Sequence, residues 1–395
     1  MNIQGFVTKF LSVSIAQNLA YFNILLITLG VVILKVNTGR LSKTNQLWLT
    51  FYLVYYSFAI LASGIYGFDS NILSTLVAPM YFIGFYYLLS NPDQLKIFYK
   101  ILTISMVISS FFTIYFYKIN FNYDIAGVVG RDIDRAEGLY GDANNAALAS
   151  IIAYILFNKF YTPPYNIFKA VKILILIAIF YSIFITFSTT GLLAFIVIFF
   201  ILNYKFFTGM RIILLGLGIV LFYLGIFSIK SQTKELNLSQ AQIVKVDNII
   251  NVLTLNVEKV DSSGRGYLLE NLMYYLYKNP LLGNGLSFAS KASGHNTYLG
   301  VWVDAGLFTF LYFIFVLSFY MVKTFTLELH LKLFSMSLLI ALYISMLSLQ
   351  TVINQPYLVV LFAFVGYIID NSKESSHQLS FIKNKRFKID NDRKV

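Results

Sequence analysis

Stretches of about twenty apolar residues recur along almost the whole chain, and they restrict its fold more than any other feature. A helix needs about 20 such residues to cross the hydrocarbon core of a bilayer. We expect spans at 18–35, 47–66, 72–90, 99–117, 143–160, 171–187, 190–204, 212–229, 296–320, 333–352 and 356–370. The sequence therefore predicts an all-α, polytopic integral membrane protein with eleven spans, or twelve if the amphipathic stretch 3–17 also crosses rather than lying at the interface.

Composition agrees with this class. Hydrophobic residues make up 58% of the chain and charged residues 12%, whereas a soluble domain carries roughly 25% charged residues. We expect one transmembrane bundle over 1–370 and a basic tail over 371–395, without a cleavable signal peptide before the first span. There is no cysteine, which excludes disulfides and thiolate chemistry.

The net charge of +12 suggests nucleic acid at first, but the positions of the charges argue against that partner. Basic residues occur in alternate short loops, whereas the loops 67–71, 188–189 and 353–355 contain none. The basic residues of the alternate loops are Lys35, Arg40, Lys43, Lys96, Lys169, Lys205, Arg211, Lys323 and Lys332. By the positive-inside rule, the tail is cytoplasmic and the other loops lie on the opposite, outer side of the membrane.

The outer loop 230–295 has 66 residues, and loops of that length are usually functional or disordered. Its segment Gly264–Asn279 is predicted to be a helix lying on the bundle, ended by Pro280 and two glycines. Its apolar residues at helical spacing are Leu268, Leu269, Leu272, Met273, Tyr275 and Leu276. We therefore expect one large, structured periplasmic loop.

The start of this loop helix carries Arg265 and Glu270. The first N–H groups of a helix favour an anion, and a guanidinium offers a planar set of donors suited to phosphate oxygens. Arg265 is therefore a candidate for phosphate binding. A solvated surface arginine fits the spacing equally well.

The second candidate is His295, directly before the span 296–320. A helix N-terminus disfavours the imidazolium and keeps a neutral base available. The alternative is a polar helix cap, although Asn296 can supply that cap by itself. Carbohydrate could rest on Tyr267, Tyr298 or Trp302, or these rings belong to the interfacial aromatic belt.

The third group comprises Arg131 and Arg135, followed by Asp142 and Asn144 at the start of the next span. Either of the last two fits a helix N-cap. The arginines are candidates for substrate binding, or they pair with Asp132, Asp134 and Glu137 in a loop network. Asp304, two turns into its span, either pairs with a basic loop residue or only hydrogen-bonds a neighbour.

The chain lacks two kinds of motif that would indicate other chemistry. No outward-facing group of His, Cys or carboxylates has metal-ligand spacing, so we expect no catalytic metal and no cofactor. No phosphate-binding glycine motif occurs, so we expect no nucleotide hydrolysis by this chain. Any chemical energy has to arrive with the substrate.

These groups, in this order, resemble the O-antigen polymerase and O-antigen ligase superfamily, with motif support over about 118–320. The similarity lies in Arg135-x-x-Gly138 with Asp142-x-Asn144, in Arg265 leading to Asn279-Pro280-Leu-Leu-Gly283-Asn-Gly285, and in His295-Asn296-x-Tyr298 with Gly306 beyond. One departure is Ser188-Thr189-Thr190, where members often carry an arginine. Arg131 or Arg135 would then supply that charge.

The resemblance implies a GT-C-like bundle and a metal-independent glycosyltransferase with an undecaprenyl-diphosphate-linked glycan as donor. In it Arg265 would bind the diphosphate and His295 would activate the acceptor or contact the phosphate. We expect substrate contacts from Arg135, Arg131, Asn296, Asn144, Glu270 and Tyr298. The expected function is polymerisation of O-antigen or capsule repeat units, with membrane lipid and a chain-length regulator protein as partners. The alternatives are an O-antigen ligase and a lipid-linked oligosaccharide transporter.

Overall fold

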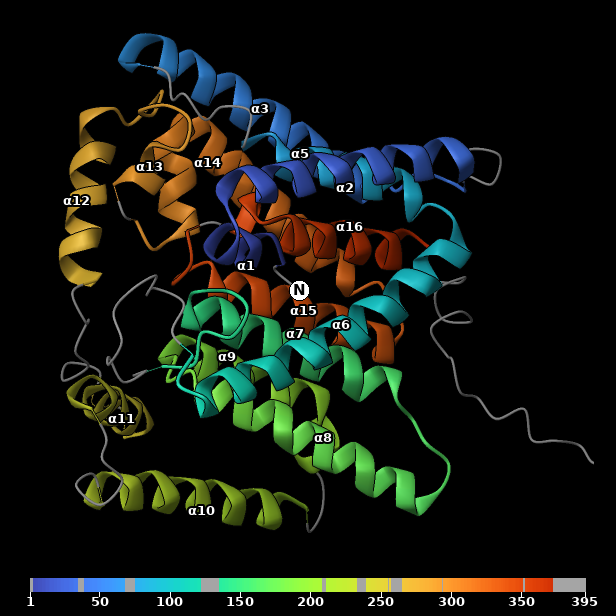
Figure 1. Ribbon diagram of the computed structural model, residues 1–395, viewed down its shortest axis with the longest axis vertical. Helices are drawn as coiled ribbons and strands as arrows, with labels where there is room; N and C mark the ends of the chain where they lie inside the picture. Colours follow the sequence, from blue (N-terminus) through green and yellow to red (C-terminus); the bar gives the residue numbers. More distant parts are fainter. Residues whose placement is uncertain are drawn as a thin grey trace, which may run out of the picture.

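The computed structural model describes residues 3–34, 39–67, 75–121, 135–207, 211–232, 239–254, 256, 265–292, 294–350 and 352–371. This part of the chain is helical and contains no strand, which confirms the all-α prediction (Figure 1).

Each predicted span overlaps one helix of the described part. The helices are α2 (Val13–Leu34), α3 (Lys43–Tyr66), α5 (Val77–Leu88), α6 (Pro92–Lys118), α7 (Ala143–Phe160), α8 (Asn166–Phe184), α9 (Thr189–Leu202), α10 (Arg211–Ser231), α14 (Thr297–Thr324), α15 (Leu329–Ser345) and α16 (Pro356–Asp370). Among them α2, α3, α6, α8 and α14 are long and apolar enough to cross a membrane. By length and composition these five helices are consistent with an α-helical membrane protein, while α5, α9, α15 and α16 are shorter apolar helices.

The N-terminal boundary differs from the prediction. The stretch 3–17 does not form one helix: α1 (Ile3–Phe10) is separate, and α2 already begins at Val13. The hydroxyl oxygen of Ser12 accepts a hydrogen bond from the N–H of Ile15 at 3.1 Å, in the manner of an N-cap. A polar residue that the hydropathy pattern treats as an interruption therefore starts the helix.

The centre of the bundle is formed by α7 and α16. Every residue of α7 from Ala143 to Leu156 is buried, as is every residue of α16 from Leu358 to Ile369. The many alanines of α7 let neighbouring backbones approach closely. The helix α7 packs against α6, α8, α9 and α15, which surround it.

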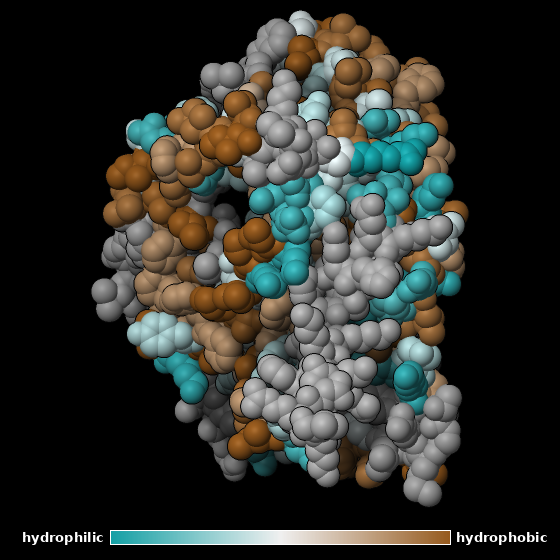
Figure 2. Space-filling model, turned by 90° about the vertical axis from the view of Figure 1, so that its right-hand side faces the viewer, coloured by the Kyte–Doolittle hydropathy of each residue, from teal (hydrophilic) through white to brown (hydrophobic). Residues whose placement is uncertain are grey.

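The helices at the edge of the bundle expose apolar side chains instead. Exposed residues of α2, α8 and α10 include Phe22, Leu25, Leu29, Ile173, Leu174, Ile177, Leu217, Leu221 and Leu224. Apolar surface of this extent is rare on soluble monomers and is expected where lipid covers a helix. Figure 2 faces the end of the bundle where α7 joins α8, and it shows hydrophilic side chains across the middle between hydrophobic flanks.

The insertion between α10 and α14 contains α11 (Gln240–Leu253), α12 (Arg265–Lys278) and α13 (Phe288–Lys291). The predicted loop helix is confirmed as α12, whereas α11 was not predicted. In Figure 1, α12 and α13 lie at the left, at the start of α14, and the link between α7 and α8 lies at the opposite end. The insertion therefore covers one end of the bundle.

Candidate functional site

The loop helix α12 is held against the first turns of α14 by a small apolar cluster. Leu272 and Leu276 of α12 are 1% and 4% exposed, and they pack with Ala289 of α13 and Val303 of α14. A Cβ added at Gly294 would lie 2.5 Å from a methyl group of Leu272, so α12 also touches the residue directly before His295.

The helix α14 is broken at Gly306, whose φ is +81°. The chain that follows α12, residues 279–285, lies in this break and supplies the hydrogen bonds that the helix lacks. The N–H of Asn284 donates to the carbonyl of Val303 at 2.7 Å, and the N–H of Leu307 donates to the carbonyl of Pro280 at 2.9 Å. Buried backbone polar groups have to be paired in this way, most of all in a membrane.

Glycine is required at this contact because two backbones meet without side chains between them. A Cβ at Gly306 would lie 2.0 Å from the carbonyl oxygen of Leu281, and one at Gly283 would lie 2.5 Å from that of Asp304. Gly283 also has a positive φ, of +81°. The Gly283 and Gly306 positions of the sequence motif thus mark one close approach of the loop to α14.

Side-chain amides reinforce the loop. Asn284 is 5% exposed and donates through Nδ2 to the carbonyl of Val303 at 3.0 Å. Its Oδ1 accepts from Nδ2 of Asn279 at 2.6 Å, and Oδ1 of Asn279 accepts from the hydroxyl of Tyr66 at 2.7 Å. The loop is therefore tied to the end of α3 as well as to α14.

His295 precedes the first turn of α14, and its side chain is exposed. The N-cap of the helix is Asn296, whose side-chain oxygen accepts the N–H of Leu299 at 3.1 Å. His295 is therefore not the cap. Its imidazole makes no hydrogen bond to the described part of the chain, so both ring nitrogens are available to a ligand.

The remaining candidates at this end have different surroundings. Arg265 is the first residue of α12, but its side chain lies outside the described residues, as does that of Tyr267; Glu270 is exposed. Tyr298 donates its hydroxyl to the carbonyl of Tyr343 on α15 at 3.0 Å. Trp302 donates from its indole N–H to the carbonyl of Pro280 at 2.9 Å. Tyr298 therefore connects α14 to α15, and Trp302 connects α14 to the segment 279–285.

Arg135 lies at a second junction, between the start of α7 and the link from α8 to α9. Its Nε donates to the carbonyl of Thr186 at 2.9 Å, and its Nη2 donates to Oδ1 of Asn144 at 3.3 Å. That oxygen also accepts from the hydroxyl of Ser188 at 2.8 Å. The Arg135 guanidinium is thus linked through Asn144 to Ser188, in the segment where the resemblance leads one to expect an arginine.

Two expectations about this second junction have different outcomes. Asp142, rather than Asn144, is the N-cap of α7, since its carboxylate accepts the N–H of Asn145 at 2.8 Å. Arg131, with Asp132 and Asp134, lies outside the described residues, so the predicted charge network stays a prediction.

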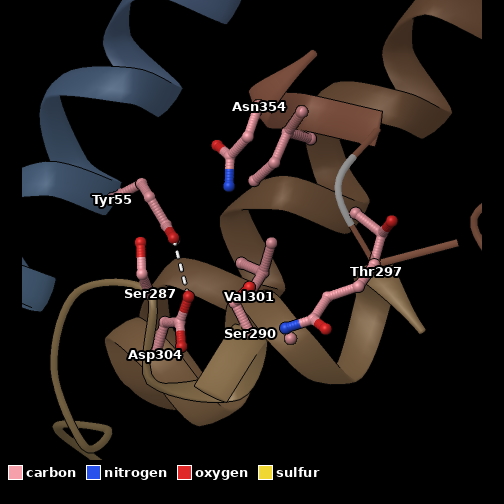
Figure 3. A pocket seen from close by; sticks show the side chains of 10 residues that line it. Tyr55, Ser287, Ser290, Thr297, Val301, Asp304 and Asn354 are labelled. Carbon is pink, nitrogen blue, oxygen red and sulfur yellow. Dashed lines mark hydrogen bonds between the residues drawn. The ribbon is translucent and has the colours of Figure 1, made fainter. Parts of the chain in front are cut away.

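Asp304 is 5% exposed and lies inside the bundle beside the break in α14. Its Oδ2 accepts a hydrogen bond from the hydroxyl of Tyr55 at 2.8 Å (Figure 3). Its Oδ1 accepts one from the N–H of Ala289 at 2.7 Å. Of its two predicted roles, the hydrogen bond to neighbours is the observed one. Sequence reasoning missed Tyr55, because nothing local links it to a carboxylate 249 residues away.

Metal-binding groups and known relatives were both sought for this chain. In the part of the chain that the structure describes, no three His, Cys, Asp or Glu side chains gather where they could hold a metal ion. In comparisons with known proteins, no family model matches the chain, and no curated protein matches it either.

Proposed function

We propose that the chain is a polymerase that joins undecaprenyl-diphosphate-linked oligosaccharide units into O-antigen or capsular polysaccharide at the outer face of the bacterial inner membrane. The end of the bundle that carries α12 and α13 would be the outer end. The proposal rests on the sequence resemblance together with the geometry of that end.

One observation carries the proposal furthest. The helix that begins at Arg265 packs directly on the helix that begins after His295, through Leu272, Val303 and the segment 279–285. Two residues thirty positions apart in the sequence, Arg265 at the start of α12 and His295 just before α14, therefore lie at the starts of two helices that pack together. A rigid frame of this kind is what a catalytic pair requires, because small displacements cost much of the rate.

The chemistry needs one base and one set of cationic donors. A hydroxyl oxygen of the acceptor sugar attacks the anomeric carbon of the donor, and the bond from that carbon to the phosphate oxygen breaks. The diphosphate leaves with the electron pair, and cationic donors such as Arg265 and Arg135 stabilise its charge. His295, exposed and not used as a cap, takes the proton of the attacking hydroxyl.

The nearer alternative is a ligase that transfers the finished glycan to lipid A core or to a protein. The departure at Ser188-Thr189-Thr190 favours the polymerase, because the arginine that often stands there looks more strictly kept in ligases. The other alternative is a lipid-linked oligosaccharide transporter. Transporters leave broken helices open to their substrate near the midplane of both halves. The break in α14, by contrast, is filled by the chain's own segment 279–285.

The test is complementation of a deletion strain, scored by the length of the surface glycan. We expect His295→Ala and Arg265→Ala each to lower polymer formation by about a hundredfold or more, the range of general acid–base catalysis for His295 and of electrostatic stabilisation for Arg265. His330→Ala, which changes the histidine beside Glu328, and Lys278→Ala, at the other end of α12, serve as matched controls and should give normal chains. Normal chains from both site variants, at normal protein levels, would remove the proposed site.

The glycan of the deletion strain separates the alternatives. Single repeat units attached to the lipid A core or to the cell surface indicate a polymerase. Complete loss of attached glycan, with long chains still on the lipid carrier, indicates a ligase. Accumulation of repeat units on the cytoplasmic side indicates a transporter.

A further inference from the structure

A small polar cavity lies between α3, α14 and the segment that follows α15. It has a volume of about 10 Å³, room for one water-sized sphere. The residues that line it are Tyr55, Ser287, Ser290, Thr297, Gly300, Val301, Asp304, Gln350, Ile353 and Asn354. Most of the wall is therefore oxygen-bearing or amide side chains, although the cavity lies inside an apolar bundle.

The carboxylate of Asp304 has no cationic partner among the described residues. Its partners are the Tyr55 hydroxyl and the N–H groups of Ala289, Ser287 and Phe288, all of them neutral donors. Burying a carboxylate costs several kcal/mol unless an opposite charge, a bound ion or a proton compensates it. The structure thus places a buried acid, with only neutral donors as partners among the described residues, on the wall of a cavity that has room for one small ligand.

One buried polar atom of the wall lacks a partner in the described part of the chain, Oδ1 of Asn354. Ser290 is exposed and Ser287 is half-buried, and neither side chain makes a hydrogen bond to the described residues, so both hydroxyls are free to turn toward a ligand. Figure 3 shows the amide of Asn354 directed into the cavity from the side opposite Asp304. Rotation about its last torsion exchanges the oxygen and the nitrogen, so either can face the cavity. Buried polar groups without partners are uncommon and call for a ligand.

We propose that this cavity binds one small monovalent cation, with Na⁺ as the reference ion, between Asp304, Asn354 and the hydroxyls of Ser287 and Ser290. The proposal does not depend on the glycosyltransferase function. The bound ion compensates the buried carboxylate and joins α14 to the segment that follows α15.

The composition of the wall favours a single charge. Hard cations prefer oxygen ligands, and sites for Ca²⁺ commonly supply several carboxylates. Here Asp304 is the one acidic side chain of the cavity, and the other oxygens are neutral. One carboxylate and one monovalent ion sum to zero charge, which is the arrangement that a low-dielectric interior tolerates best.

The experiment is thermal unfolding of the purified full-length protein in detergent, titrated with NaCl against choline chloride at constant ionic strength. A ligand that binds only the folded state raises Tm with its concentration. We expect Na⁺ to raise the Tm of the wild type saturably, and Asp304→Asn to abolish the rise. Asn354→Leu should keep the fold and raise the half-saturating Na⁺ concentration at least tenfold.

Asp370→Asn is the matched control. Asp370 also accepts hydrogen bonds from neutral groups, Ser42 and Thr44, but it lies outside the cavity, so its variant should respond to Na⁺ as the wild type does. The proposal is overturned if Tm is the same in NaCl, LiCl, KCl and choline chloride. It is also overturned if Asn354→Leu responds as the wild type does. This experiment measures Tm and not glycan polymerisation. A negative result for the cation site therefore leaves the proposed function unaffected, and a negative complementation result leaves the cation site unaffected.

Discussion

The two junctions that carry the candidate residues are built in different ways. At the break in α14, the segment 279–285 meets residues 303–307 backbone to backbone, with glycines at the points of contact. At the second junction, the side chain of Arg135 joins Thr186 and Asn144, and beside it the N–H of Ala136 donates to the carbonyl of Ile185 at 3.0 Å. The first junction depends on glycines where its backbones meet, whereas the second combines one backbone hydrogen bond with the hydrogen bonds of the Arg135 side chain.

The difference has a physical consequence. Where two backbones are in contact, an added side-chain atom has no space to occupy. Protein interiors are close-packed, so such an atom forces the backbones apart and strains the fold. A long side chain that donates to a carbonyl and an amide can be replaced, at the cost of those hydrogen bonds. The α14 break should therefore be the rigid frame of the site, and the Arg135 junction should be the more tolerant of the two.

The largest expected effect is that of Gly306→Ala. A Cβ there would meet the Leu281 carbonyl at 2.0 Å, and the φ of +81° disfavours any L side chain. We expect a loss of about 3 kcal/mol or more in the free energy of unfolding, measured by thermal unfolding in detergent. The control is Gly216→Ala on α10, where no atom lies within 4 Å, and it should be neutral or slightly stabilising. Equal losses from both variants would show that the contact is not rigid.

An intermediate effect is expected for Arg135→Ala. It removes the hydrogen bonds to Thr186 and Asn144, and it should cost about 1–2 kcal/mol by the same measurement. Arg135→Lys keeps the charge but not the planar arrangement of donors, so it should fall between Ala and the wild type. A loss as large as that of Gly306→Ala would contradict the contrast between the two junctions.

The smallest effects separate the two residues before α14. Asn296→Ala removes the N-cap and should cost about 1 kcal/mol, whereas the exposed His295→Ala should stay within about 0.5 kcal/mol of the wild type. If polymer formation then fails in His295→Ala at unchanged Tm, the loss is chemical rather than structural. A marked fall in Tm for His295→Ala would instead give that residue a structural role.

Much of the architecture could be predicted from the sequence. The apolar runs coincide with helices of the described part, and the spacing from Leu268 to Leu276 gave α12 correctly. The missed helix α11 carries a similar signal, in Ile243, Val246 and Ile249, but it is weaker because charged and amide residues interrupt it. The N-terminal boundary was wrong because α2 already begins at Val13 and continues through the polar residues Ser14, Gln17 and Asn18.

For the candidate site, the sequence identified residues but not their partners. It pointed to Arg135, Asn296 and the two glycines, whereas the Thr186 carbonyl, the Asn279–Asn284 amide pair and Tyr55 appear only in the folded chain. A hydrogen bond between groups far apart in sequence leaves no periodic pattern in either segment, and residue type alone does not select the partner.

The sequence by itself determined that this chain forms apolar helices, and it placed most of them along the chain to within a few residues. In lipid every backbone polar group has to be paired, and a helix pairs them within one segment of the chain. A run of apolar residues is therefore enough to indicate where such a helix lies. Only the tertiary structure decided that α14 breaks at Gly306, that segment 279–285 fills the break, and that Asp304 meets Tyr55 across 249 residues. Those features depend on which surfaces of the bundle come together, and packing in three dimensions sets that choice.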